Sequence, residues 1–158
     1  MRPCRFIPML LALLCAATLI SCSTGRRTLS KTTDTQSSTF SSDADKIAFV
    51  EHYCTLASPL ITTEFHIVYH DNESGRVPGP SDWDMQVLML VRPQDAPRWT
   101  NGMLHVPAQH IDLAWGYVLL PPDPRWMITS QPVVYERSGV IVAVFEREGI
   151  IFKRVWTT

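Results

Sequence analysis

The sequence predicts an α+β domain in which an N-terminal amphipathic helix packs on an antiparallel sheet of about four to five strands. Three patterns lead to this prediction. Apolar residues recur at helical spacing in the segment 44–58, and strand-like segments follow at 60–70 and 82–92. The chain then closes with two β-branched and aromatic runs separated by a short turn, which predicts a C-terminal β-hairpin.

The helix is predicted to begin at Ser42. Ser42 followed by Asp45 has the spacing of a capping box, with Asp in place of Glu or Gln. An apolar stripe at three- and four-residue spacing then runs through Cys54, and Pro59 ends the helix. We therefore expect Cys54 to lie in the core, where burial raises the pKa of a thiol.

The first strands of the sheet are predicted from alternation and from apolar content. Apolar and polar residues alternate in residues 60–70, as in a half-buried strand. The centre of residues 82–92 is apolar on both faces, as in a strand covered on each side. Residues 133–137 have the composition of a third, shorter strand.

The rest of the chain contains a predicted hairpin, a predicted helical turn and one segment that stays open. Residues 140–145 and 150–156 form the predicted hairpin, with Gly149 in a left-handed conformation. Residues 93–103 have the signals of a short helical turn. Residues 111–120 fit a strand or a short helix equally well, and prolines end the segment in either case.

The N-terminus has the features of a secretory signal peptide over residues 1–21. Arg2 and Arg5 precede an apolar run of about 15 residues, short of the roughly 20 that span a bilayer as a helix. The run closes with Leu19 and Ile20, and the small residues Ser21 and Cys22 follow it.

This Leu19-Ile20-Ser21-Cys22 segment resembles the lipobox of bacterial lipoproteins. The resemblance implies cleavage before Cys22, which would carry the lipid, including palmitate, and anchor the chain in the cell envelope. Ser23 stands where an aspartate would resemble an inner-membrane retention signal. The resemblance therefore implies a lipoprotein of the cell outer membrane that faces the periplasm. It covers the leader alone.

Residues 22–43 are predicted to be a disordered tether that follows the lipidated Cys22, because they are rich in Ser and Thr and show no periodicity. Residues 44–158 are predicted to form a single globular domain. If lipid occupies Cys22, this domain retains Cys54 alone and has no internal disulfide.

The charge of the predicted domain excludes one class of partner. From residue 44 onward there are 9 Lys and Arg against 13 Asp and Glu. Nucleic-acid binders carry a basic face, so we expect no nucleic-acid partner.

A protein-binding surface is predicted around the Pro- and Gly-rich segment that follows residue 70. Asp71, Glu73, Asp82 and Asp84 crowd its two edges, with Trp83 among them. Acidic groups around an aromatic anchor suit a basic protein partner. The competing interpretation is a solvated loop whose Trp83 folds onto the core.

The candidates for chemistry are weaker. His105, His110 and Asp112 supply the groups of an acid–base or metal site, but their spacing matches no specific template. Glu64 and His66 lie on one face of a predicted strand and are expected to be a solvated polar surface. We predict no catalytic residue, no metal and no cofactor.

Five tryptophans leave two interpretations open, a glycan-binding groove or the core and covering layers of the sheet: Trp83, Trp99, Trp115, Trp126 and Trp156. The function predicted from the whole sequence is a non-enzymatic protein-binding module of the envelope, of the inhibitor, immunity or adaptor type. The alternatives are an envelope hydrolase that uses a His/Asp site and a structural or assembly lipoprotein of the outer membrane. The partner's identity and the oligomeric state stay open.

Overall fold

The computed structural model describes residues 33–70 and 81–157. The strands in this part of the chain are β1 (Thr33–Gln36), β2 (Thr62–His70), β3 (Asp82–Leu90), β4 (Leu104–Val106), β5 (Val133–Arg137), β6 (Val140–Phe145) and β7 (Ile150–Trp156). The α-helices are α1 (Asp43–Tyr53) and α2 (Ala114–Leu119), and 3-10 turns lie at Ser37–Thr39, Pro93–Thr100, Ala108–His110 and Pro124–Trp126.

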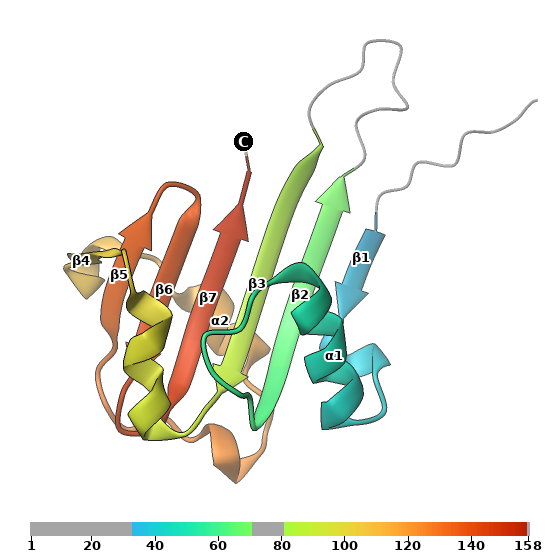
Figure 1. The fold of residues 1–158 in the computed structure, drawn as a ribbon, viewed down its shortest axis with the longest axis horizontal. Coiled ribbons are helices and arrows are strands. Elements are labelled where there is room, and N and C mark those ends of the chain that lie inside the picture. The colour runs from blue at the N-terminus through green and yellow to red at the C-terminus, as the bar shows by residue number, and fades with distance from the viewer. Residues whose placement is uncertain (1–32, 71–80, 158) are drawn as a thin grey trace, which may run out of the picture.

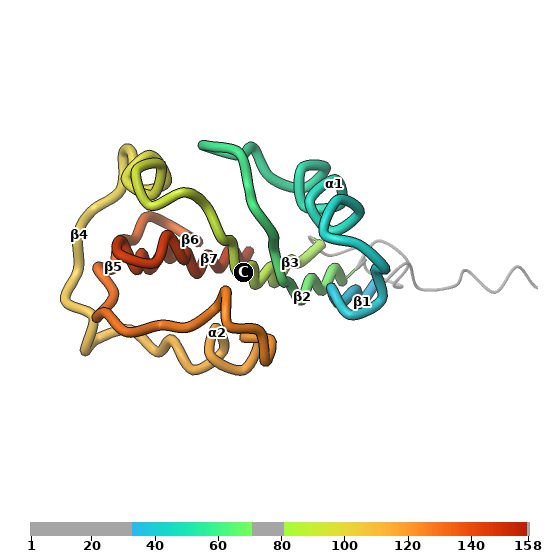
Figure 2. Tube along the Cα trace, turned by 90° about the horizontal axis from the view of Figure 1, so that it is seen from below, coloured from blue at the N-terminus to red at the C-terminus, as the bar shows by residue number. Residues whose placement is uncertain are grey.

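All of these strands join one antiparallel sheet with the order β1-β2-β3-β7-β6-β5-β4. One face is covered by α1 and by the 3-10 turn Pro93–Thr100, and the other by α2 and the segments around it (Figures 1 and 2). We refer to these as the α1 face and the α2 face.

The fold class predicted from the sequence is wrong. The sheet has seven strands among the described residues, rather than four or five. The α-helices are short, with 11 residues in α1 and 6 in α2, and strand β1 precedes α1. The described chain is therefore mainly an antiparallel β protein. The missed strands, β1 and β4, have only four and three residues, too few to show a strand periodicity in sequence.

The predicted tether is also wrong over its last part. Residues 33–36, expected to be disordered, form β1 and pair with β2, with Thr33 opposite Tyr69 and Gln36 opposite His66. A polar segment joins a sheet when a partner edge supplies backbone hydrogen bonds, because strand preference depends on context more than on composition. The predicted signal peptide, Cys22 and the tether up to residue 32 lie outside the described residues.

Helix α1 starts where the sequence predicts and ends earlier. Ser42 Oγ accepts a hydrogen bond from the backbone N–H of Asp45 at 3.1 Å. The helix ends at Tyr53, and Cys54 follows in an extended conformation, so the predicted stripe does not continue on a helix. Cys54 packs against the core, and burial raises the pKa of its thiol.

The core has two clusters, one on each face of the sheet, because successive strand residues point to opposite sides. Phe65, Val87 and Ile151 belong to the cluster on the α1 face. Leu88 and Phe152 belong to the cluster on the α2 face. The central strands β3 and β7 are therefore apolar on both sides over much of their length, as predicted for residues 82–92.

The predicted hairpin of β6 and β7 is present, and its turn closes one end of the sheet. Gly149 has φ 70°, the left-handed conformation that favours glycine. The carbonyl oxygen of Gly149 accepts a hydrogen bond from the N–H of Val91 at 2.9 Å. A Cβ at Gly149 would collide with the carbonyl oxygen of Val91, so only glycine fits this contact.

Hydrogen bonds of Glu148 connect the same turn to Thr129 and Ser130, in the segment before β5. Its carboxylate accepts hydrogen bonds from the N–H and hydroxyl groups of both Thr129 and Ser130, at 2.5 to 3.0 Å. These bonds, those of the two hydroxyls first, lower the pKa of Glu148 to about 2. We call this region, around Val91, Thr129, Ser130, Glu148 and Gly149, the closed end of the sheet.

Candidate functional site

The opposite end of the sheet is hollowed around the last residues of β7. A cavity of about 320 Å³ on the α2 face is lined by Arg154 and Trp156, and one of about 420 Å³ on the α1 face is lined by Val155 and Thr157. A third, of about 330 Å³, lies beside the β5–β6 turn and again includes Trp156. Alternation along β7 explains why one strand serves both faces. We call this region the open end.

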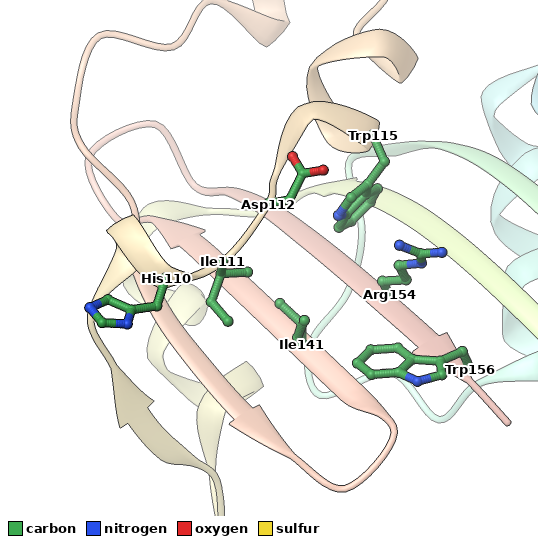
Figure 3. Close-up of a pocket in the computed structure, with 7 residues that line it drawn as sticks. All are labelled: His110, Ile111, Asp112, Trp115, Ile141, Arg154 and Trp156. Carbon is green, nitrogen blue, oxygen red and sulfur yellow. The ribbon is translucent and has the colours of Figure 1, made fainter. Parts of the chain in front are cut away.

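The cavity on the α2 face, which we name the Trp115 cavity, combines aromatic, aliphatic and charged groups. Trp115 comes from α2, Trp156 and Arg154 from β7, and Ile111 and Ile141 supply apolar surface. Figure 3 shows the two indoles on either side of Arg154. The pocket is therefore built from segments far apart in the sequence.

Arg154 is held in a fixed orientation. Its Nε and Nη2 donate to Oδ1 and Oδ2 of Asp84, each at 2.9 Å, which is a bidentate pair. Its guanidinium carbon lies 5.9 Å from the ring centroid of Trp156. The bond to Asp84 raises the pKa of Arg154, and the negative charges of Asp84 and Asp112 add to the effect. The guanidinium therefore enters the cavity with its charge largely offset.

Two further polar groups face this cavity. Asp112 accepts a hydrogen bond from the backbone N–H of Ala114 at 2.8 Å through Oδ1, and its side chain is exposed. The indole Nε1 of Trp115 is buried and has no acceptor among the described residues. A buried donor without a partner costs about 1–3 kcal/mol, so a group that accepts from it would be stabilised at this position.

The residues of the hydrolase hypothesis are only partly brought together. His110 and Asp112 both line the Trp115 cavity, whereas His105 lies on β4 with its ring against Tyr135, 5.7 Å between centroids. The ring of His110 points away from the other lining residues (Figure 3). No hydrogen bond joins His110 to Asp112 in the described chain, so the pair is not arranged as base and orienting carboxylate.

The residues of the predicted protein-binding surface do not share one face. Asp82, Trp83 and Asp84 are the first residues of strand β3, which begins where the sequence predicts a strand. Asp84 pairs with Arg154 on the α2 face, whereas Trp83 packs against the rings of Tyr53 and Tyr69 on the α1 face. Period-two alternation separates neighbours in a strand in this way. Asp71 and Glu73 lie outside the described residues.

Trp83 instead lines the cavity on the α1 face, which we name the Trp83 cavity. Tyr53 from α1, Trp83 and Met85 from β3, and Val155 from β7 make it mainly aromatic and apolar. His52 and Thr157 stand at its margin with polar groups. Trp83 therefore lies at a surface hollow, apart from the acidic residues that the sequence prediction grouped with it.

The solvated polar surface predicted from Glu64 and His66 is wrong, because both side chains are half-buried and paired. Lys46 Nζ donates to Glu64 at 2.6 Å, and His66 Nε2 lies 2.8 Å from Asp34 Oδ1. Among the described residues, no cluster of three His, Cys, Asp or Glu side chains is arranged to hold a metal ion. In the same part of the chain, no helix is long and apolar enough to cross a membrane.

Two of the tryptophans, Trp99 and Trp126, lie in the core, as one of the two interpretations of the sequence expects. Trp126 is buried in the α2-face core, and Trp99 is buried on the α1 face, where its Nε1 donates to Ser58 Oγ at 2.9 Å. Trp115 and Trp156 flank the Trp115 cavity. The sequence analysis did not identify Arg154 as a residue of this cavity. The available signal was a charged residue inside the apolar run of β7.

No protein-family model, no curated protein and no solved structure matches this chain.

Proposed function

We propose that this chain is a lipid-anchored protein of the cell envelope that acts as a non-enzymatic protein-binding module, of the inhibitor, immunity or adaptor type. The anchor is assigned to Cys22 from the resemblance of Leu19-Ile20-Ser21-Cys22 to a lipobox. The binding surface is assigned to the open end of the sheet, and within it to the Trp83 cavity.

The observation that carries the binding proposal is the lining of the Trp83 cavity. It offers about 420 Å³ between α1 and the sheet, walled by Tyr53, Trp83, Met85 and Val155. Tyrosine, tryptophan and methionine are enriched in the cores of protein interfaces, where an apolar side chain of the partner fills a pocket. Tyr53 is 38% exposed and is therefore already available for such a contact.

Charge favours a basic partner. The described residues contain 13 Asp and Glu against 8 Lys and Arg. An acidic excess attracts a basic protein over several ångströms and speeds its association. We therefore expect the partner to present an apolar or aromatic side chain within a basic surface.

The anchor is tested by replacing its proposed attachment residue. In Cys22→Ala, palmitate labelling should disappear and the protein should leave the membrane fraction, since no thiol is left to carry the lipid. Cys54→Ala is the matched control and should keep both label and membrane association. Unchanged labelling of the Cys22→Ala protein would contradict the anchor.

The binding surface is tested by capture from envelope extracts, followed by affinity measurement with the partner recovered. Tyr53→Ala should weaken that affinity about tenfold or more, the size expected of an interface aromatic. Val118→Ala is the control, because Val118 is 83% exposed on α2, away from the Trp83 cavity. Equal affinity of the Tyr53→Ala protein and the unmodified chain would rule out this surface.

A further inference from the structure

We infer that the Trp115 cavity binds one ring of an uncharged saccharide. This site lies on the α2 face, opposite the Trp83 cavity, and the inference does not depend on the proposed protein partner. It follows from the charge, the hydrogen-bonding groups and the shape of the cavity, taken in turn.

The charges of the cavity disfavour an ionic ligand. Arg154 already occupies the cation position over Trp156 and is paired with Asp84, so a ligand cation finds that position filled. Asp84 and Asp112 would in turn repel an anion. A neutral polar ligand does not need that position and is not repelled.

The hydrogen-bonding groups of the cavity include donors and an acceptor, so they suit a ligand that both accepts and donates. Trp115 Nε1–H is buried without an acceptor, and Nη1 of Arg154 has no bond to the described residues, so both can donate. Asp112 Oδ2, by contrast, can only accept. Hydroxyl groups do both, and a saccharide ring carries several of them on adjacent carbons.

The shape fits one ring with a polar edge and an apolar face. The cavity of about 320 Å³ lies near the lower limit of the roughly 300–1,000 Å³ typical of small-molecule sites. The indoles of Trp115 and Trp156 and the side chains of Ile111 and Ile141 offer apolar surface to the C–H face of the ring.

The test titrates the full-length chain, purified in detergent micelles, with four tetrameric probes at up to millimolar concentration. Chitotetraose and maltotetraose are neutral, tetragalacturonate is anionic and tetralysine is cationic. We expect at least one neutral saccharide to bind by calorimetry, and neither charged probe to compete with it. Displacement of the bound saccharide by tetralysine or tetragalacturonate, or no binding of either neutral saccharide, would overturn the inference.

Matched variants test whether the saccharide binds in this cavity. Trp115→Phe keeps an aromatic ring but removes the donor, and should weaken saccharide binding about three- to tenfold, the value of one hydrogen bond. Trp83→Phe makes the same change on the α1 face and should leave saccharide affinity unchanged. The inference fails if Trp83→Phe weakens binding and Trp115→Phe does not.

Discussion

The two ends of this sheet are built from the same strands and differ in what happens to their polar groups. At the closed end, Glu148 has four hydrogen bonds to Thr129 and Ser130, and Gly149 lies directly against Val91. At the open end, aromatic and charged side chains of β7 line cavities on both faces. On the proposed function, the closed end supplies stability and the open end supplies the binding surfaces.

The largest effect expected from this comparison is at Gly149. Gly149→Ala places a Cβ against the carbonyl oxygen of Val91 in a left-handed conformation, so the free energy of unfolding should fall by about 3 kcal/mol or more. Gly102→Ala is the matched control: φ is 72° and no atom lies within 4 Å of the added Cβ. Its cost should be limited to about 1–2 kcal/mol of backbone strain.

Denaturant unfolding of both proteins measures the difference. Where Gly149→Ala does not accumulate as a folded protein, comparing its soluble yield with that of Gly102→Ala gives the same ranking. An equal loss of unfolding free energy in the two proteins would mean that the contact of Gly149 with Val91 does not stabilise the closed end.

The next effect is a pH dependence. Because the pKa of Glu148 is lowered from 4.5 to about 2 in the folded chain, its stabilisation is complete above pH 4.5 and is lost as the pH falls toward 2. Glu148→Gln should cost about 1 kcal/mol at neutral pH and should flatten this acid-side decline. Glu146→Gln, an exposed neighbour in the same turn, is the control and should keep the decline. Identical pH profiles for the Glu148→Gln protein and the unmodified chain would refute the assignment.

The smallest effect on stability is expected at the open end. Arg154→Lys keeps the charge but loses the bidentate geometry with Asp84. The side chains of Arg154 and Asp84 are 36% and 34% exposed, so solvent screens the pair and the free energy of unfolding should change by less than about 1 kcal/mol. The affinity for the proposed saccharide should fall nonetheless, because lysine lacks the guanidinium that lies over Trp156. A large loss of stability would show that the open end also holds the fold together.

Part of this fold could be predicted from local patterns. The strands with strong alternation or apolar content were found near their true positions, as were the N-cap at Ser42 and the left-handed Gly149. Strand β1 could not be found, because its four polar residues form a strand only against the edge of β2. That omission, together with β4, led to the wrong fold class.

The site was less predictable than the fold, because it depends on which strand neighbours face the same side. Asp84 was expected beside Trp83 and instead meets Arg154, which is 70 residues away in sequence. Register decides that contact: Asp84 lies opposite Trp156 on β7, and Gln86 lies opposite Arg154. Sequence alone gave no means of pairing β3 with β7, so the Trp115 cavity could not be assembled.

Strand β1 limits the distance between the sheet and the proposed lipid anchor. Thr33 pairs with Tyr69, and the same end of the sheet contains Asp84 and Trp156, so the chain joins the sheet beside the cavities (Figure 1). The proposed lipid on Cys22 is only 11 residues upstream, and a chain of that length spans at most about 40 Å. On the proposed anchor, Thr33 and the end of the sheet that contains it would therefore stay within about 40 Å of the bilayer surface.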